Sequence, residues 1–232
     1  MIRRSLLSWI VAPLLLIVAG IMVARRSPSA TGAVLTSAGM GAAPGAGVKH
    51  RVARGAGTTS TSSVAVLAGG CYWGVESVFR HVRGIESVTS GYALPATAEG
   101  SRFAGPAEAV RIEYDTSRIS YSQILDVFFS VVHDPTQLNR QGPDVGPSYR
   151  SIVFADGDEQ RGVVRSYIDS LSAARVFTRP IVTQVATLRS FQAADASEQD
   201  YAAHHPHSAY ILINDVPKVE ALKKRFPRLY HE

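Results

Sequence analysis

The chain has 232 residues, enough for one domain with a substantial core after a terminal segment is set aside. Its formal net charge of +5 is uneven, because residues 1–62 hold seven of the 24 basic residues and no acidic one. The remainder has 17 basic and 19 acidic side chains, about −2, which excludes the basic folded domain typical of nucleic-acid-binding proteins.

Residues 1–26 contain an apolar run from Leu6 to Ala24, LLSWIVAPLLLIVAGIMVA, with an arginine pair on each side. Nineteen mostly apolar residues can just span a hydrocarbon core of about 30 Å, so the run predicts a membrane anchor. A cleaved signal peptide is the alternative, although it usually has a shorter apolar core and a small-residue cleavage site. We expect the domain that follows to be extracytoplasmic (periplasmic), membrane-anchored or, after signal cleavage, secreted.

Residues 27–62 are rich in Gly, Ala, Ser and Thr and lack apolar periodicity. Burial of so few large side chains could not offset the entropy of ordering the chain. We therefore expect a flexible linker, with the folded domain over residues 63–232.

Strand and helix patterns are interleaved in the domain, which predicts a single layered α+β or α/β fold. Short apolar or alternating runs predict strands at 64–69, 86–92, 109–114, 151–155 and 181–188, and YILIN at 210–214 is also strand-like. Helical spacing predicts helices at 73–82, 120–131, 158–174 and 216–226, the second opened by a Ser120–Gln123 capping box. The long Pro- and Gly-rich segment at 133–150 is a candidate functional loop.

Cys71 is the only cysteine of the chain and stands where the first strand gives way to the first helix. The partial positive charge of a helix N-terminus favours the thiolate, which is the nucleophilic form. Gly70 lets the backbone come close to a ligand. A buried cysteine acting as a small hydrophobic residue is the alternative, but the flanking glycine and aromatic pairs favour a reactive thiol.

A reactive thiol needs a partner group. A cysteine hydrolase would need a base histidine, for which His81, His133 and the HHPH cluster at 204–207 are candidates. That cluster lacks a cysteine or carboxylate at metal-ligand spacing, so we expect no metal site there. Glu108, beside apolar residues at the start of a strand, is expected to have a raised pKa and to donate a proton, unless it is an ordinary exposed strand-end glutamate.

Four segments in this order, GGCYWGVE, AEAVRIEYD, HDPTQLNRQGPDVGPSYRS and EQDY, resemble the A-type peptide methionine sulfoxide reductases across residues 63–228. The resemblance implies an α+β, two-layer domain with a mixed sheet and a ferredoxin-like split βαβ core. It also implies thiol-dependent reduction of methionine-(S)-sulfoxide, peptide-bound or free, and hence repair of oxidatively damaged proteins. The expected partners are oxidised proteins or peptides.

The resemblance assigns a role to each matching residue. Cys71 would attack the sulfoxide sulfur, and Glu108 would protonate its oxygen. Tyr149 would hydrogen-bond that oxygen, and Asp144 would be a polar residue of the same site. Product release would leave a sulfenic acid on Cys71.

Two aromatic residues complete the implied site, and the sequence differs from the family pattern at several positions around it. Tyr72 stands in place of the family's usual phenylalanine, and with Trp73 it would hold the ε-methyl group of the substrate. The family pattern has a histidine where this chain has Glu198. The segment GYALPATAEGSRFAGPAEAV is shorter than in the family and lacks a tyrosine that contacts the sulfoxide oxygen, for which Tyr92 is a weak substitute.

Because the chain has no second cysteine to resolve the sulfenic acid, an external thiol must reduce it. A thioredoxin-like protein, a glutaredoxin and glutathione are the candidates, and no bound cofactor is expected. We expect a monomer. Two other functions stay open: a catalytically weak relative that binds methionine or methionine sulfoxide segments as a sensor or chaperone, and a cysteine hydrolase.

Overall fold

The computed structural model describes residues 61–98 and 105–232. The predicted membrane segment at 1–26 and all but the end of the predicted linker lie outside the described residues, and a strand already begins at Ser62. The strands are β1 (Ser62–Ala68), β2 (Ile85–Ala98), β3 (Ala107–Asp115), β4 (Arg140–Gln141), β5 (Asp144–Val145), β6 (Ile152–Phe154) and β7 (Gln184–Ala193). The helices are α1 (Tyr72–Arg80), α2 (Tyr121–Val127), α3 (Gly157–Ala173), α4 (Tyr201–His204), α5 (Ala209–Asn214) and α6 (Val216–Arg225), with a π-helical turn η1 (Phe128–Val132) and 3₁₀ turns η2 (Pro147–Tyr149) and η3 (Ala196–Glu198).

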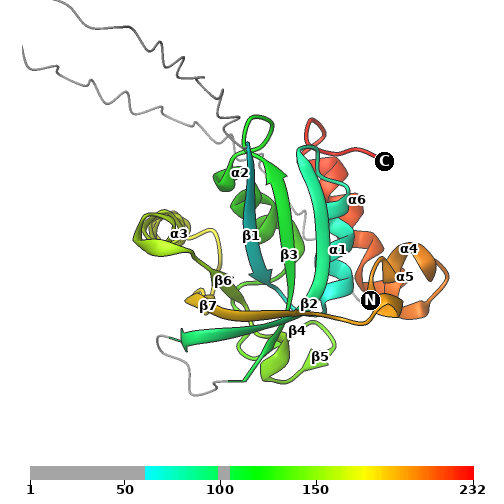
Figure 1. The fold of residues 1–232 in the computed structure, drawn as a ribbon, viewed down its shortest axis with the longest axis horizontal. Coiled ribbons are helices and arrows are strands. Elements are labelled where there is room, and N and C mark those ends of the chain that lie inside the picture. The colour runs from blue at the N-terminus through cyan, green and yellow to red at the C-terminus, as the bar shows by residue number, and fades with distance from the viewer. Residues whose placement is uncertain (1–60, 99–104) are drawn as a thin grey trace, which may run out of the picture. The chain divides into compact units, whose positions relative to one another are not determined.

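The sheet confirms the expected mixed α+β domain. Strands β1 and β2, which α1 connects, lie on either side of β3 and are antiparallel to it, and β6 is antiparallel to β1 (Figure 1). Strand β7 then runs antiparallel to β2 and parallel to β6. This second pairing of β7 joins the two ends of the sheet into a closed five-stranded barrel.

The sequence pattern does not predict this closure, which the shape of β2 makes possible. Strand β2 is 14 residues long, and its pairing with β7 is irregular around Pro95. Such irregularities bend a strand and increase its twist. The bent end of β2 can thus pair with β7 while the rest of the strand pairs with β3.

The barrel interior is filled by small side chains. One side of each strand supplies a cluster that is at most 5% exposed: Val66, Ala68, Ala93, Ala107, Ala109, Ile152, Phe154 and Ala186. Five of these are alanine, as the narrow space within a five-stranded barrel requires.

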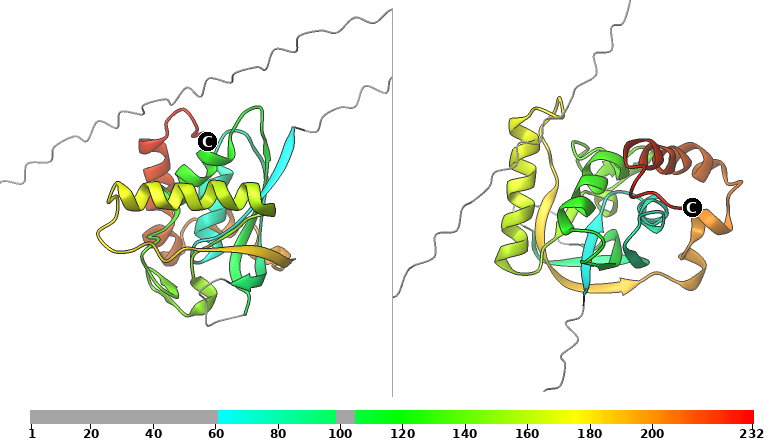
Figure 2. Two further views of the ribbon diagram at one scale, coloured as in Figure 1. Left: turned by 90° about the vertical axis from the view of Figure 1, so that its left-hand side faces the viewer. Right: turned by 90° about the horizontal axis from the view of Figure 1, so that it is seen from above.

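The larger core lies between the outer barrel face and the helices. Helix α1 buries Val75, Val78 and Phe79, as its spacing predicts, against β2 and β3. Helices α1 and α6 lie on one side of the barrel and α3 on the other, beside β7 (Figure 2). The predicted capping box of α2 is confirmed, with the Gln123 N–H donating to the hydroxyl of Ser120 and the Ser120 N–H donating to the Gln123 side chain.

The prediction of a strand at 210–214 is wrong, because this segment forms helix α5. The closed barrel leaves no free edge with which this run could pair. Its Ile211 is buried, whereas Leu212 and Ile213 are 50% and 71% exposed, so the run does not alternate between two sheet faces.

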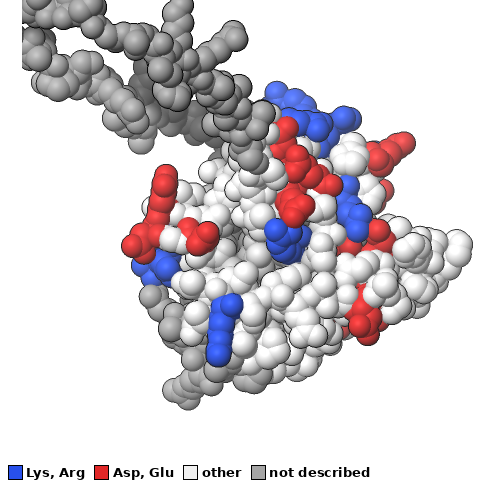
Figure 3. All heavy atoms as spheres, in the orientation of Figure 1, with Lys and Arg blue, Asp and Glu red and all other residues white. Residues whose placement is uncertain are grey.

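The surface carries both signs of charge. On the face shown in Figure 3, Lys and Arg side chains are interspersed with Asp and Glu side chains. Within residues 61–98 and 105–232, no helix has the length and apolar character needed to cross a membrane.

Candidate active site

A glycine turn places Cys71 at the start of α1. Gly70 has φ +103°, which other residues rarely adopt, and a Cβ there would lie 2.7 Å from the side chain of Gln141. Cys71 is the N-cap residue of α1 and is 8% exposed. The turn between β1 and α1 thus places a nearly buried thiol close to the loop at 133–150, whose Tyr149 interacts with it electrostatically.

The thiol is protonated in the free protein. Burial raises the pKa of Cys71 to about 12, and the negative charge of Glu108 adds to the effect. Hydrogen bonds from the Trp73 N–H and the Tyr210 hydroxyl act in the opposite direction. The expectation that the helix N-terminus alone would favour the thiolate is wrong, because desolvation and the neighbouring carboxylate outweigh these contacts.

Glu108 lies beside Cys71 at the same end of α1. The alternation of β3 places it on the same side as Val110 and Ile112, which face the helix, and its Oε2 accepts a hydrogen bond from the Tyr72 N–H at 3.2 Å. Burial raises the pKa of Glu108 to about 7, and the charges of Asp144 and Glu198 contribute. The predicted raised pKa is confirmed, and the carboxyl group is half protonated near neutral pH.

The loop at 133–150 supplies two more side chains. The Tyr149 hydroxyl hydrogen-bonds the Glu108 carboxylate, whose charge raises the pKa of Tyr149. Asp144 accepts a hydrogen bond of 2.6 Å from the Tyr210 hydroxyl. The structure therefore brings all four predicted catalytic residues to one place, at the N-terminus of α1.

Tyr72 and Trp73 form an aromatic wall with partners from the C-terminal region. Trp73 stacks on Tyr201 at a ring distance of 3.8 Å and meets Tyr210 edge-on at 5.6 Å. The Tyr72 hydroxyl lies 3.4 Å from that of Tyr92, so the hydroxyl of Tyr92 is turned toward the predicted methyl pocket.

The sequence-based prediction gives no role in this site to Tyr201 and Tyr210, and it includes Glu198 only as a departure from the family pattern. Glu198 and Tyr201 both lie in the EQDY segment, whose contacts with Trp73 become visible only in the fold. Tyr210 was hidden by the interpretation of 210–214 as a strand. Tyr210 lies in the first turn of the short helix α5, and its hydroxyl hydrogen-bonds Cys71.

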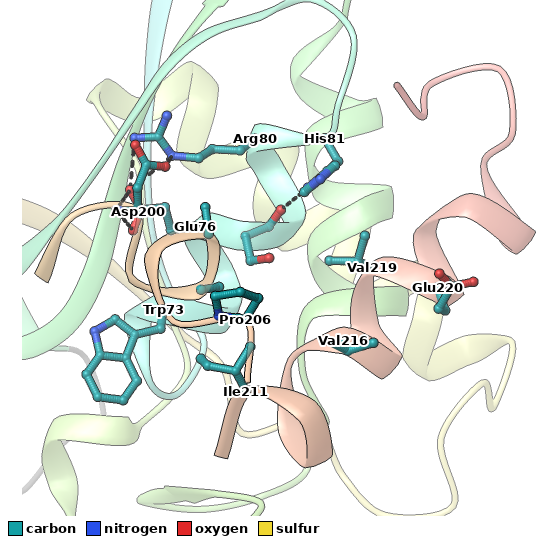
Figure 4. A pocket seen from close by; sticks show the side chains of 13 residues that line it. Trp73, Glu76, Arg80, His81, Asp200, Pro206, Ile211, Val216, Val219 and Glu220 are labelled. Carbon is teal, nitrogen blue, oxygen red and sulfur yellow. Dashed lines mark hydrogen bonds and ion pairs between the residues drawn. The ribbon is translucent and has the colours of Figure 1, made fainter. Parts of the chain in front are cut away.

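A hollow of about 290 Å³ lies behind this wall, between α1 and the C-terminal helices (Figure 4). Trp73 lines one part of it, and Glu76, Arg80 and Asp200 form an ion-pair cluster at its margin. Neither Cys71 nor Glu108 lines it. The hollow is therefore not the place where the thiol meets a substrate.

No histidine is among the described groups that act on the Cys71 thiol. Both ring nitrogens of His133 are engaged, Nδ1 with the Phe128 carbonyl at 3.0 Å and Nε2 with the Ser151 hydroxyl at 2.7 Å. The ring of His81 stacks on Tyr230, and that of His205 stacks on Tyr201. This arrangement disfavours a cysteine hydrolase.

A buried thiol beside a carboxyl group poised to donate a proton, with tyrosine hydroxyls around both, defines a thiol-dependent enzyme site in an α+β barrel domain. Comparison with known proteins gives the family. Residues 63–229 match the sequence profile of the family described as peptide methionine sulfoxide reductase. The chain belongs to this family.

Individual relatives and a solved structure that resemble this chain support the family assignment. Peptide methionine sulfoxide reductase MsrA 2 of Mesorhizobium japonicum is 46% identical over 177 residues, which cover 74% of this chain and 91% of that protein. MsrA 2 of a Synechocystis strain is 41% identical over 175 residues, 73% of this chain and 82% of that protein. The crystal structure of reduced Mxr1 from Saccharomyces cerevisiae matches with a TM-score of 0.55 and 27% identity, over 63% of this chain and 87% of that chain.

Proposed function

We propose that this protein reduces methionine-(S)-sulfoxide, peptide-bound or free, with Cys71 as the nucleophile and Glu108 as the proton donor. Thiol-dependent reduction of methionine sulfoxide, and with it protein repair, follows from membership of the family. The observation that carries the residue assignment is the meeting of a buried thiol with a carboxyl group of pKa about 7 at the start of α1.

The first half-reaction moves one oxygen atom. Tyr72 and Trp73 hold the methyl group, and protonated Glu108 gives its proton to the sulfoxide oxygen, with Tyr149 hydrogen-bonding that oxygen. The resulting carboxylate takes the thiol proton while the sulfur of Cys71 attacks the substrate sulfur. The S–S bond formed by this attack then breaks as the hydroxyl group passes from the substrate sulfur to Cys71. Methionine sulfur thereby gains two electrons, Cys71 sulfur loses two, and one proton ends on the sulfenic acid.

The second half-reaction needs two external thiol groups, because Cys71 is the only cysteine in the sequence. The first thiol attacks the sulfenic sulfur, forms a mixed disulfide and releases water. The second thiol releases Cys71 as a thiol and leaves the donor as a disulfide. A thioredoxin-like dithiol protein fits this requirement, with glutaredoxin and glutathione as the other candidate donors.

A single-turnover experiment tests the assignment. Without reductant, the protein should convert about one equivalent of substrate and leave a sulfenic acid on Cys71, which dimedone traps for mass spectrometry. Cys71→Ser should give neither product nor adduct. Product formed by Cys71→Ser would contradict the assignment, and binding of the sulfoxide without conversion would favour the sensor alternative.

Further proposals concern the setting of the domain. The strand order β6-β1-β3-β2, with α1 and α2 among its connections, supports a ferredoxin-like split βαβ core. The apolar segment at 6–24 supports a membrane anchor, with the domain extracytoplasmic. We also propose that the protein is a monomer. Protease protection of the domain in spheroplasts would contradict this location, whereas digestion by added protease would agree with it.

A further inference from the structure

Glu198 is fixed against both aromatic residues of the methyl pocket. Its Oε2 accepts hydrogen bonds from the Trp73 indole N–H at 3.0 Å and from the Tyr72 hydroxyl at 3.3 Å. The side chain is half-buried at the end of η3. The carboxylate thus lies at the edge of the pocket that receives the substrate.

The backbone around Glu198 is held to the barrel and to α1. The side chain of Gln199 accepts a hydrogen bond from the Ser90 N–H and donates one to the Ser90 carbonyl, each at 2.9 Å. The Asp200 N–H donates to the buried carboxylate of Glu76 at 3.1 Å. Because these contacts fix Gln199 and Asp200, they also keep the Glu198 carboxylate in place beside Trp73.

The described side of the pocket is acidic. The charges of Asp144 and Glu198 both act on Glu108, so the three carboxyl groups share one electrostatic environment. The cations of neighbouring described elements contact other groups. Arg150 donates to the carbonyls of 105, 106 and 147, Arg80 pairs with Glu76 and Asp200, and Lys218 pairs with Asp215.

From this geometry we infer that Glu198 determines substrate preference, favouring methionine sulfoxide flanked by cationic side chains in the peptide. The inference rests on the proposed function and names the substrate class of that same site. A lysine or arginine next to the sulfoxide residue is attracted by the Glu198 charge, whereas a flanking glutamate is repelled.

The test compares three short peptides in which methionine-(S)-sulfoxide is flanked by Lys, Ser or Glu. The full-length protein should give kcat/KM values in the order Lys, Ser, Glu, with about a three- to tenfold difference between the first and the last at low salt. Because the half-buried carboxylate is partly exposed to solvent, 0.5 M NaCl should reduce the difference.

Two variants separate charge from structure. Glu198→Gln keeps an acceptor for the Trp73 and Tyr72 hydrogen bonds but removes the charge, so the Lys-to-Glu ratio should fall to within about twofold of one. A purely structural role would lower turnover of all three peptides in the same proportion. Glu159→Gln, an exposed acid of α3 on the opposite side of the barrel, is the matched control and should keep the wild-type ratio.

The outcomes are distinct. An unchanged Lys-to-Glu ratio in Glu198→Gln, or equal kcat/KM values for all three peptides in the wild-type protein, would overturn the inference and leave the reductase function intact. Absence of turnover of the Ser-flanked peptide by the folded wild-type protein would contradict the proposed function itself.

Discussion

Glu108 must be protonated to act as a donor, and its raised pKa of about 7 sets the pH range in which it does so. The first half-reaction should therefore be fastest below pH 7 and slow as the pH rises through 7, because the carboxylate has no proton to give. Glu108→Gln should lower the single-turnover rate about 10²- to 10⁴-fold and remove this inflection. Single-turnover rates measured by rapid quenching across pH 5.5–8.5, in the absence of reductant, report both effects. Persistence of the inflection in Glu108→Gln would assign it to another group.

The Tyr210 hydroxyl links two parts of the site, since it hydrogen-bonds both Cys71 and Asp144. Tyr210→Phe should lower kcat about two- to tenfold, the effect of losing one hydrogen bond to the reacting thiol worth about 0.5–1.5 kcal/mol. Tyr167→Phe is the matched control, because the Tyr167 hydroxyl donates a similar 2.6 Å hydrogen bond to Asp126 outside the site. Equal kcat values in the two variants would exclude a specific role for Tyr210.

Residues were predictable from the sequence where a local pattern carried the information. Cys71 was identified by its uniqueness and its place before a helix, and Glu108 by its apolar neighbours. The pKa of Cys71 was not predictable, because the opposing effect comes from burial and from Glu108, which is 37 positions away in the chain. The contacts of Glu198 with Trp73 and of Tyr210 with Cys71 were not predictable either, because they form only when the C-terminal region packs against α1.

At the scale of elements, Gly74 allows α1 to approach the junction of α5 and α6. A Cβ at this position would lie 2.1 Å from Asp215 Oδ1 and 2.5 Å from Lys218 Nζ, which form an ion pair between a buried Asp215 and a partly exposed Lys218. Gly74→Ala should lower the free energy of unfolding by about 2–4 kcal/mol, because it separates this pair or moves the helices apart.

Gly162→Ala is the control for Gly74→Ala. Gly162 lies in the middle of α3, and a Cβ there meets nothing within 4 Å. This change should raise stability by about 0.5–1 kcal/mol, because alanine is the better helix former. Denaturant unfolding of both variants measures the contrast, and equal stabilities would contradict the packing of α1 on the α5–α6 junction.

Helices were the elements that the sequence predicted best. The spacing of Val75, Val78 and Phe79 and the Ser120–Gln123 capping box depend on neighbours within one or two turns. The run at 210–214 was misassigned, because a short apolar segment fits a strand or a buried helix equally well and only the tertiary context decides.

At the scale of the whole domain, His133 links η1 to Ser151, the residue before β6, through its two ring nitrogens. Burial lowers the pKa of His133 to about 4, below an unfolded value of about 6.5. The unfolded chain therefore binds this proton first as the pH falls. The contribution of neutral His133 is complete above pH 6.5 and is lost progressively toward pH 4, by up to about 3 kcal/mol.

The difference in unfolding free energy between the wild type and His133→Gln isolates this effect. That difference should shrink as the pH falls from 7.5 to 4.5. The comparison is needed because Glu108, whose pKa is raised on folding, changes stability in the opposite direction. A difference that stays constant over this range would contradict a neutral, buried His133.

The closure of the barrel is the feature of the whole domain that the sequence pattern could not predict. Periodicity identifies strands one at a time, whereas the partners of β7 are set by long-range pairing with β2 and β6. The alanines of the inner cluster were the available sign, since small residues on one side of several strands suit a narrow interior.

The central claim is that Cys71 reduces one epimer of methionine sulfoxide with help from Glu108. The most direct measurement follows both epimers of a racemic dabsylated methionine sulfoxide by chiral chromatography, with dithiothreitol as the reductant. The account predicts loss of the S epimer alone, abolished by Cys71→Ser and strongly slowed by Glu108→Gln. Turnover of the R epimer, or activity that survives Cys71→Ser, would contradict it.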